Sequence, residues 1–279
     1  MSRAVTRRST RLRSLATGLL LALSSIGAQA GGEGPPPTIA IIIDDMGNNI
    51  TQGRRLIEMD QPLTLAFLPY RRHTRALAKS AHANRKEIML HAPMANTRRL
   101  SLGPGGLEAG MGEHGITGTL RRALKAIPHV KGVNNHMGSL LTQQLAPMRW
   151  IMSELDRYPL YFVDSRTIAS SVAADAARDR RIPHLSRDVF LDHKTTTEYV
   201  DAQFQKLIAT ARRNGTAIAI GHPHKVTVDY LEKHLPELDQ QGIAVATVSS
   251  LWAMRHDNRR MFVEGEKQAV APALAKKDE

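Results

Sequence analysis

Residues 38–49 read TIAIIIDDMGNN, and they are the strongest indication of the fold class. An apolar, largely β-branched run ends in two adjacent aspartates, and turn-forming residues follow them. A short run of this kind bounded by turn residues predicts a buried strand. If the strands of this chain are parallel, their carboxyl ends share one rim, where α/β proteins build their active sites. The stretch therefore predicts an α/β protein with its chemistry at the end of this strand.

The same arrangement, an apolar run that ends in an ionisable residue, recurs along the chain. The further cases are EIML (87–90) before His91, GVNN (132–135) before His136, LYFV (160–163) before Asp164, and TAIAIG (216–221) before His222, Pro223 and His224. All the predicted strands are 39–43, 63–68, 87–90, 132–135, 160–163, 189–191, 217–220 and 243–248. The predicted helices between them are 50–59, 74–83, 118–126, 147–157, 171–180, 197–213 and 226–235. Such alternation favours parallel strands with right-handed crossovers, in a closed or nearly closed barrel of seven or eight strands. An open doubly wound sheet is the alternative.

The two ends of the chain differ from this pattern. Residues 1–30 combine five arginines, an apolar run and the sequence Ala28-Gln29-Ala30, which predicts a signal peptide cut after Ala30 and a periplasmic or secreted protein. A retained N-terminal anchor is the alternative, and no other stretch is apolar enough for a membrane span. Residues 31–37 (GGEGPPP) predict a linker, 38–255 the barrel domain, and 256–279 a C-terminal extension in the form of a flexible tail.

Composition limits the classes of function. Without residues 1–30 the chain has 33 Lys and Arg against 26 Asp and Glu, an excess that favours peripheral contact with anionic envelope polymers. Aromatic residues make up only 4%, and no recognition motif occurs, so we expect no nucleic-acid partner. The chain has no cysteine, which excludes disulfides and a thiol nucleophile and limits metal ligands to histidine, carboxylate and backbone groups.

Asp44 and Asp45 are the first candidates for chemistry. Neither a G-x-G-x-x-G nor a G-K-[ST] motif follows them, so a nucleotide role is disfavoured. Two carboxylates this close raise the pKa of one of them, which favours a base beside a metal-bound partner. The alternative is a turn in which Asp44 caps the next helix.

The histidines at the strand ends complete the candidate set. His91 and His136 on neighbouring strands form, with Asp45, a facial set that suits zinc or a similar divalent ion with an open position for water. His222 and His224 fall on the same side of an extended chain, so that one could serve as an acid and the other could support it.

Other ionisable residues carry weaker signals. Asp164 and Arg166 leave a strand together, and they could form a structural salt bridge or orient the rim. Asp188 and Asp192 flank a short apolar run and are weaker candidates. No nucleophile-elbow pattern accompanies the serines, so serine-hydrolase chemistry is disfavoured.

At these residues the chain resembles the divergent polysaccharide deacetylase family, the YibQ-like branch of the NodB-related carbohydrate esterases. The resemblance covers about residues 38–252. It is carried by IAIIIDDMGNN (39–49), LAFLPY (65–70), LHAPM (90–94), GVNNHMGS (132–139), FVDSRT (162–167) and IAIGHPH (218–224).

The resemblance implies a distorted (β/α) barrel, NodB-like, and metal-dependent removal of N-acetyl groups from an amino-sugar polymer. By this resemblance Asp44 is the general base, Asp45 the metal carboxylate, His91 and His136 the metal imidazoles, and His222 the acid that protonates the leaving amine. The remaining motif residues are expected to bind substrate or shape the site; they are Asn135, Asp164, Arg166 and His224. The better-known deacetylases take both histidines from one H-[ST]-x-x-H motif, whereas here 45 positions separate them.

The leading hypothesis is therefore a metal-dependent hydrolase that uses a divalent metal, expected to be zinc, on a cell-envelope glycan. A catalytically degenerate glycan-binding or envelope-partner protein on the same scaffold is the second hypothesis, because the histidines are dispersed and aromatic residues are few. A metal phosphoesterase is the third, because Asp and His rims serve that chemistry as well.

Overall fold

The computed structural model describes residues 35–256. The predicted signal peptide lies outside the described residues, as do 31–34 of the predicted linker and all but the first residue of the predicted C-terminal extension. Within the described part, no helix has the length and apolar character that crossing a membrane requires.

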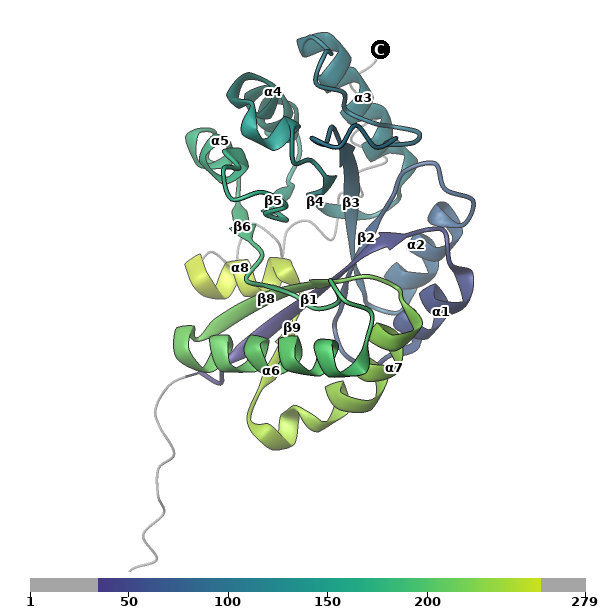
Figure 1. The fold of residues 1–279 in the computed structure, drawn as a ribbon, viewed down its shortest axis with the longest axis vertical. Helices are drawn as coiled ribbons and strands as arrows, with labels where there is room; N and C mark the ends of the chain where they lie inside the picture. Colours follow the sequence, from purple (N-terminus) through teal and green to yellow (C-terminus); the bar gives the residue numbers. More distant parts are fainter. Residues whose placement is uncertain (1–34, 257–279) are drawn as a thin grey trace, which may run out of the picture. The chain divides into compact units, whose positions relative to one another are not determined.

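Strands and helices alternate along the described residues (Figure 1). The strands are β1 (Thr38–Met46), β2 (Thr64–Phe67), β3 (Glu87–Met94), β4 (Val130–Met137), β5 (Tyr161–Asp164), β6 (His184–Ser186), β7 (Val189–Phe190), β8 (Thr216–Gly221) and β9 (Ala244–Ala246). The α-helices are α1 (Ile50–Glu58), α2 (Thr74–Ala83), α3 (Glu113–Ala126), α4 (Leu145–Leu155), α5 (Ala173–Asp179), α6 (Thr197–Asn214), α7 (Lys225–His234) and α8 (Val248–His256). Short 3₁₀ turns cover Leu141–Gln143, Leu235–Glu237 and Asp239–Gln241.

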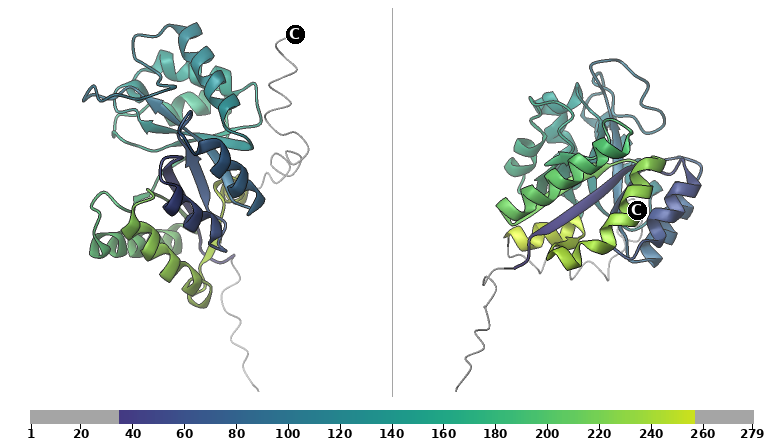
Figure 2. Two further views of the ribbon diagram at one scale, coloured as in Figure 1. Left: turned by 90° about the vertical axis from the view of Figure 1, so that its right-hand side faces the viewer. Right: turned by 60° about the horizontal axis from the view of Figure 1, so that its bottom comes forward.

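Every strand pair of the sheet is parallel, and the order is β6-β5-β4-β3-β2-β1-β8-β7, with β9 paired to β1. The sheet is curled, and helices α1 to α7 lie around its outside (Figures 1 and 2). In the described part, β6 and β7 lie at the two ends of the sheet and are not paired with each other. The two residues between them, Arg187 and Asp188, hydrogen-bond to β5 and β8 and so link the two ends of the sheet. Arg187 N–H bonds the Asp164 carbonyl at 3.1 Å, and Asp188 N–H bonds the Ile218 carbonyl at 2.9 Å. The curled parallel sheet confirms the expected distorted (β/α) barrel of seven or eight strands, since eight strands follow one another in the sheet and β9 is added beside β1.

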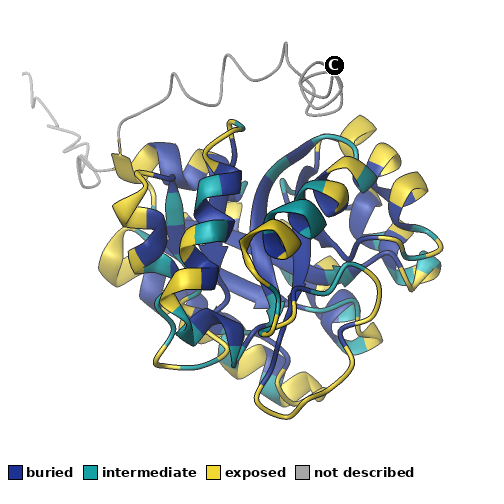
Figure 3. Ribbon diagram, turned by 90° about the horizontal axis from the view of Figure 1, so that it is seen from above, coloured by how far each residue is buried: buried dark blue, intermediate teal, exposed yellow. Residues whose placement is uncertain are grey.

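Alternation along each strand separates two apolar cores. On β1, Ile39, Ile41 and Ile43 belong to the cluster that packs the sheet against the outer helices. Ala40 and Ile42 belong to a second cluster inside the barrel. Figure 3 shows the result, since the strands are buried along their length while the helices expose their outward faces.

Helix α8 fills part of the barrel interior and was not predicted. Its Leu251 and Trp252 belong to the inner cluster together with Ala40 and Ile42 of β1. The prediction of a strand over 243–248 is wrong at its end, because β9 stops at Ala246. The apolar residues that follow β9 recur at helical spacing, and as part of α8 they face the barrel interior.

Candidate functional site

The inner face of the barrel decides which polar side chains meet at the carboxyl end of the sheet. Inner positions of β1 continue from Ala40 and Ile42 to Asp44. By the same alternation Met89 leads to His91 on β3, and Ile220 leads to His222 just after β8. Strands β1 and β8 are in register up to Ile43 and Gly221, so Asp44 and His222 are the next residues along the pair.

Asp45 does not follow this alternation, because the pairing of β1 is irregular at this point. A regular strand would direct Asp45 to the face opposite Asp44. Instead, the pairing of β1 with β2 shifts register between Ile43 and Met46, and Asp45 has a left-handed backbone with φ 55°. Such backbone is uncommon outside glycine and is concentrated at functional sites. As a result, both carboxylates contact the same ring, that of His91.

Three ligand atoms converge at this point. Asp45 Oδ1 lies 2.9 Å from His136 Nδ1 and 3.3 Å from His91 Nε2, and the two ring nitrogens are 3.0 Å apart. Ligand atoms about 2.0–2.2 Å from a zinc ion lie about 3.0–3.5 Å apart at near-tetrahedral angles. Asp45 Oδ1 is buried and has no hydrogen-bond partner, so a cation would supply the contact that it lacks. The three residues fit one divalent ion, and the fourth position of a tetrahedron remains for water or substrate.

Asn134 supports this set and was missed in the sequence, where Asn135 was chosen instead. Its amide oxygen accepts a hydrogen bond from His91 Nδ1 at 2.7 Å, and its Nδ2 donates to Asp44 Oδ1 at 2.7 Å. The proton on Nδ1 leaves Nε2 of His91 free as a metal ligand. The signal was available, because Asn134 lies two residues before His136 and therefore shares its face of the strand.

Burial and charge separate the two carboxylates. Burial raises the pKa of Asp44, although His91, His222 and the Asn134 amide act against it. The nearby Asp45 charge also raises the pKa of Asp44, but it contributes less than burial does. Burial acts in the same direction on Asp45, yet the His136 and His91 rings, whose nitrogens lie 2.9 and 3.3 Å from Oδ1, hold its pKa well below the usual range. Asp44 is therefore suited to accept a proton, and Asp45 to remain an anion.

His222 is hydrogen-bonded to Asp192, which the sequence analysis ranked only as a weaker candidate. Asp192 Oδ1 lies 2.9 Å from His222 Nδ1, and its Oδ2 accepts from the His222 backbone N–H at 2.6 Å and the Thr227 hydroxyl at 2.8 Å. Burial disfavours the charged ring, but Asp192 and the Asp44 carboxylate outweigh burial and raise the pKa of His222 to about 9. His222 is thus a cation at neutral pH and can donate a proton.

His224 is near this pair. Asp192, His222 and His224 offer ligand atoms within 4.8 Å of one another, but His224 is exposed and His222 Nδ1 is already bonded to Asp192. The Asp45 set is the better metal candidate, because its ligand atoms lie closer together and one of them lacks a partner.

The other residues predicted to shape the site order the loops of the rim. Asn135 Oδ1 accepts from Ser165 N–H at 2.9 Å, and Asn135 Nδ2 donates to the Met137 carbonyl at 2.8 Å. Asp164 Oδ1 accepts from the backbone N–H of Arg166 at 2.8 Å. No ion pair joins the Asp164 carboxylate to the Arg166 guanidinium in the part of the chain that the structure describes, so the suggested salt bridge is wrong.

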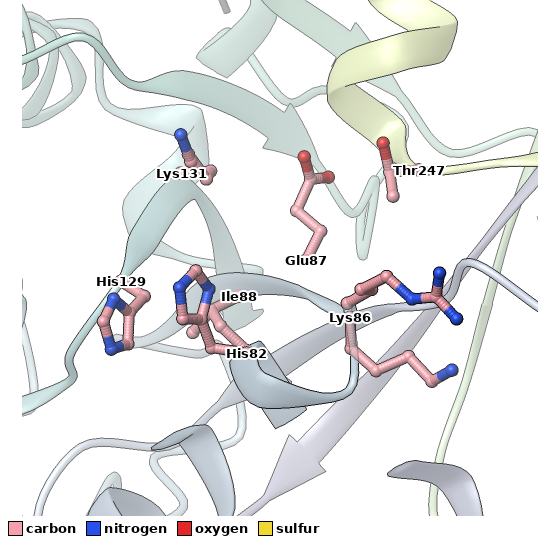
Figure 4. Close-up of a pocket in the computed structure, with 8 residues that line it drawn as sticks. His82, Lys86, Glu87, Ile88, His129, Lys131 and Thr247 are labelled. Carbon is pink, nitrogen blue, oxygen red and sulfur yellow. The ribbon is translucent and has the colours of Figure 1, made fainter. Parts of the chain in front are cut away.

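A cavity of about 390 Å³ lies away from these residues, at the amino ends of β3 and β4 (Figure 4). Its lining residues are His82, Arg85, Lys86, Glu87, Ile88, His129, Lys131 and Thr247. None of the metal or proton-transfer candidates lines it, so the cavity is separate from the candidate site.

Comparison with known proteins finds relatives of this chain. A family model described as divergent polysaccharide deacetylase matches residues 41–252. The chain is similar to the uncharacterised protein YibQ of Escherichia coli (strain K12), with 38% identity over 237 residues, 85% of this chain and 72% of that protein. It is also similar to an uncharacterised protein of Haemophilus influenzae, with 33% identity over 214 residues, 77% of this chain and 76% of that protein.

A solved structure supports the fold alone. The crystal structure of an uncharacterised protein from Agrobacterium tumefaciens C58 superposes with a TM-score of 0.75 at 24% sequence identity. The match covers 79% of this chain and 91% of that chain.

Proposed function

The chain belongs to the divergent polysaccharide deacetylase family, and from that premise we propose that it is a metal-dependent hydrolase that removes N-acetyl groups from an amino-sugar polymer of the cell envelope. The single observation that carries the proposal is the convergence of Asp45 Oδ1, His91 Nε2 and His136 Nδ1 within 3.3 Å of one another. Two histidines and a carboxylate with an open position are typical of catalytic zinc sites.

Asp45, His91 and His136 would hold the divalent ion, for which zinc is the expected choice. When bound there, the ion would polarise the amide carbonyl and lower the pKa of a water molecule. Asn134 would keep the His91 ring in the orientation that presents Nε2, as residues behind metal ligands commonly do.

Asp44 and His222 would carry the protons. Asp44, whose pKa is raised by burial, would take a proton from the attacking water. His222, with a pKa of about 9, would give a proton to the departing amine. Asp44 lies on β1 and His222 directly follows the adjacent strand β8, both on the inner face of the barrel, so they can act on one substrate group.

The predicted leader supports a periplasmic or secreted location, where envelope glycans are the available amino-sugar polymers. The excess of basic residues supports peripheral contact with anionic polymers at the same location.

Acetate release tests this function. The chain without residues 1–30, loaded with zinc, should release acetate from N-acetylated chito-oligosaccharides or peptidoglycan fragments, and Asp44→Asn should reduce kcat by at least about 100-fold. Asp156→Asn, a change of the same kind at an exposed position at the end of α4, should have no effect. The absence of acetate from the folded protein with any divalent metal would contradict the proposal.

A further inference from the structure

Three buried side-chain atoms lack a hydrogen-bond partner in residues 35–256: Asp45 Oδ1, Arg71 Nε and Ser165 Oγ. Such atoms are rare in native proteins, and each one calls for an explanation, such as a ligand or ion that completes it. Asp45 follows the inner positions of β1, Arg71 follows β2, and Ser165 follows β5, so all three lie at the carboxyl end of the sheet. A metal explains Asp45, but it does not explain Arg71.

Arg71 lies between the strands that carry the metal candidates. Strand β2 is between β1 and β3 in the sheet, and it contributes no ligand itself. The segment after it is joined to the end of β1, since Leu68 N–H bonds the Met46 carbonyl and His73 N–H bonds the Gly47 carbonyl, both at 3.0 Å. Residues 68–73 are therefore placed beside Asp45, at the rim that presents the ligand atoms.

The loop after β3 passes close to residues 68–73, and two of its glycines make this close approach possible. A Cβ at Gly103 would lie 2.7 Å from Arg71 Nη2, and one at Gly105 would lie 3.1 Å from the Tyr70 ring. Both glycines have positive φ. Tyr70 has a φ of 58°, which is unusual for a bulky residue, and it remains 47% exposed. The Tyr70 ring and the Arg71 guanidinium thus lie against the same loop at the rim.

Among the described residues, no carboxylate pairs with the Arg71 guanidinium. No ion pair or hydrogen bond of its side chain is found among the described residues, whereas the guanidinium of Arg121 forms two bonds of 2.9 Å to Glu154. Two further cations are close to this segment, because Arg122 acts on Tyr70 and Arg72 is exposed next to Arg71. A partly buried cation that no carboxylate pairs is unfavourable unless an anion binds it.

We propose that Arg71, with Tyr70 beside it, binds a carboxylate carried by the sugar polymer, so that the substrate is an acidic N-acetylated glycan. The inference rests on the proposed function for its choice of polymer. The planar fork of a guanidinium matches a carboxylate with two parallel hydrogen bonds. The face of the neighbouring tyrosine suits the apolar side of a sugar ring.

A purely structural role for Arg71 predicts a different result. If the side chain only supports the loop at Gly103 and Gly105, its removal weakens binding of acidic and neutral glycans equally. Only the carboxylate-binding role predicts that the loss of Arg71 removes the preference for the acidic glycan.

The experiment compares two matched polymers. One is a peptidoglycan glycan strand freed of peptides, in which alternate sugars carry a carboxylate, and the other is the same strand with its carboxylates converted to primary amides. Calorimetry of the zinc-loaded protein should show that the acidic strand binds at least about ten-fold more tightly, the range of a hydrogen bond to a charged group. Arg71→Met should abolish this preference, and Arg71→Lys should restore part of it.

Arg54→Met is the matched control. Arg54 is exposed on α1, and its loss removes the same charge from the chain. The control should keep the preference of the wild-type protein. If Arg71→Met does not fold, the Arg71→Lys variant and the salt dependence of wild-type binding decide, because an ionic contact weakens as salt is added.

The outcomes separate this inference from the proposed function. Equal binding of both strands by the wild-type protein, binding of neither, or a preference that survives Arg71→Met would overturn the inference, even if acetate is released. An Arg71-dependent preference without acetate release would uphold the acidic-glycan site and contradict the hydrolase.

Discussion

Asn134 connects the two parts of the candidate site through one amide group. Its oxygen holds the His91 ring and its nitrogen holds the Asp44 carboxylate, each at 2.7 Å. A single residue therefore orients the proposed metal ligand His91 and the proposed base Asp44. Residues that orient metal ligands in this way commonly affect metal affinity about 10–100-fold.

Substitution of Asn134 should weaken metal binding without removing a ligand. Asn134→Ala should reduce zinc affinity by about 10–100-fold, measured by competition with a chelator. Asn214→Ala, at the exposed end of α6, should leave the affinity unchanged. An unchanged affinity in Asn134→Ala would show that His91 does not depend on this amide.

Asp192 controls the proton on His222. The pKa of His222 is about 9, and its hydrogen bond to Asp192 is the largest contribution that raises it. Asp192→Asn should therefore lower the pKa of His222, which NMR titration of the ring can measure. Activity that needs the protonated ring should fall as pH rises through about 9 in the wild-type protein, and at lower pH in the variant.

The control for this change is Asp179→Asn, which alters an exposed carboxylate paired with Arg149 at 3.4 Å. This control should leave the pKa of His222 unchanged. If His222 titrates at the same pH in Asp192→Asn, the assigned role of Asp192 is wrong.

At the scale of single elements, β1 and β4 show how strand geometry builds the site. The register shift in β1 lets two consecutive aspartates reach one histidine ring. Strand β4 passes so close to Tyr161 that a Cβ at Gly132 would lie 2.4 Å from the ring. The inner face of β4 thus depends on a glycine two residues before Asn134.

Gly132→Ala should be destabilising because the added carbon has no space. Overpacking of this kind costs about 1–3 kcal/mol in the free energy of unfolding, which urea denaturation can measure. Gly118→Ala is the matched control in helix α3, where the nearest contact is Arg122 Nη1 at 3.5 Å. It should stabilise the protein by about 0.5–1 kcal/mol. Equal effects of the two changes would contradict the close packing at Gly132.

In the described barrel, the two ends of the interior differ in the side chains that fill them. Polar groups occupy the carboxyl end, whereas α8 packs its apolar side chains inside. Glu87 joins this helix to the sheet, because its carboxylate accepts hydrogen bonds from Thr64 at 3.0 Å, Tyr161 at 2.7 Å and Ser249 N–H at 3.2 Å. The Ser249 hydroxyl is a fourth donor.

Removal of this carboxylate should loosen the whole barrel. Glu87→Ala leaves several buried donors without an acceptor and should lower the free energy of unfolding by at least about 3 kcal/mol. Glu58→Ala on the exposed face of α1 should change it by no more than about 0.5 kcal/mol. Chemical denaturation of both variants measures the difference, and a small effect at Glu87 would mean that α8 does not need this contact.

Most of the elements could be predicted from the sequence, because buried parallel strands and amphipathic helices have distinct apolar periods. The boundaries of α2 agree with the prediction, and β1 was recognised from its isoleucines. Strand β6 was missed because His184–Ser186 is short and has no apolar run. Helix α8 was missed because Val248, its first residue, was assigned to the strand predicted over 243–248.

The sequence by itself determined the parallel α/β class and the polar residues at the strand ends, because both follow from local patterns of apolar and ionisable side chains. Only the tertiary structure decided which of these residues meet. His91 and His136 are 45 positions apart, and their nitrogens come within 3.0 Å because β3 and β4 pair in parallel with Pro93 opposite His136. Strand register and side-chain direction are set by packing across the whole barrel, and no local stretch of sequence contains them.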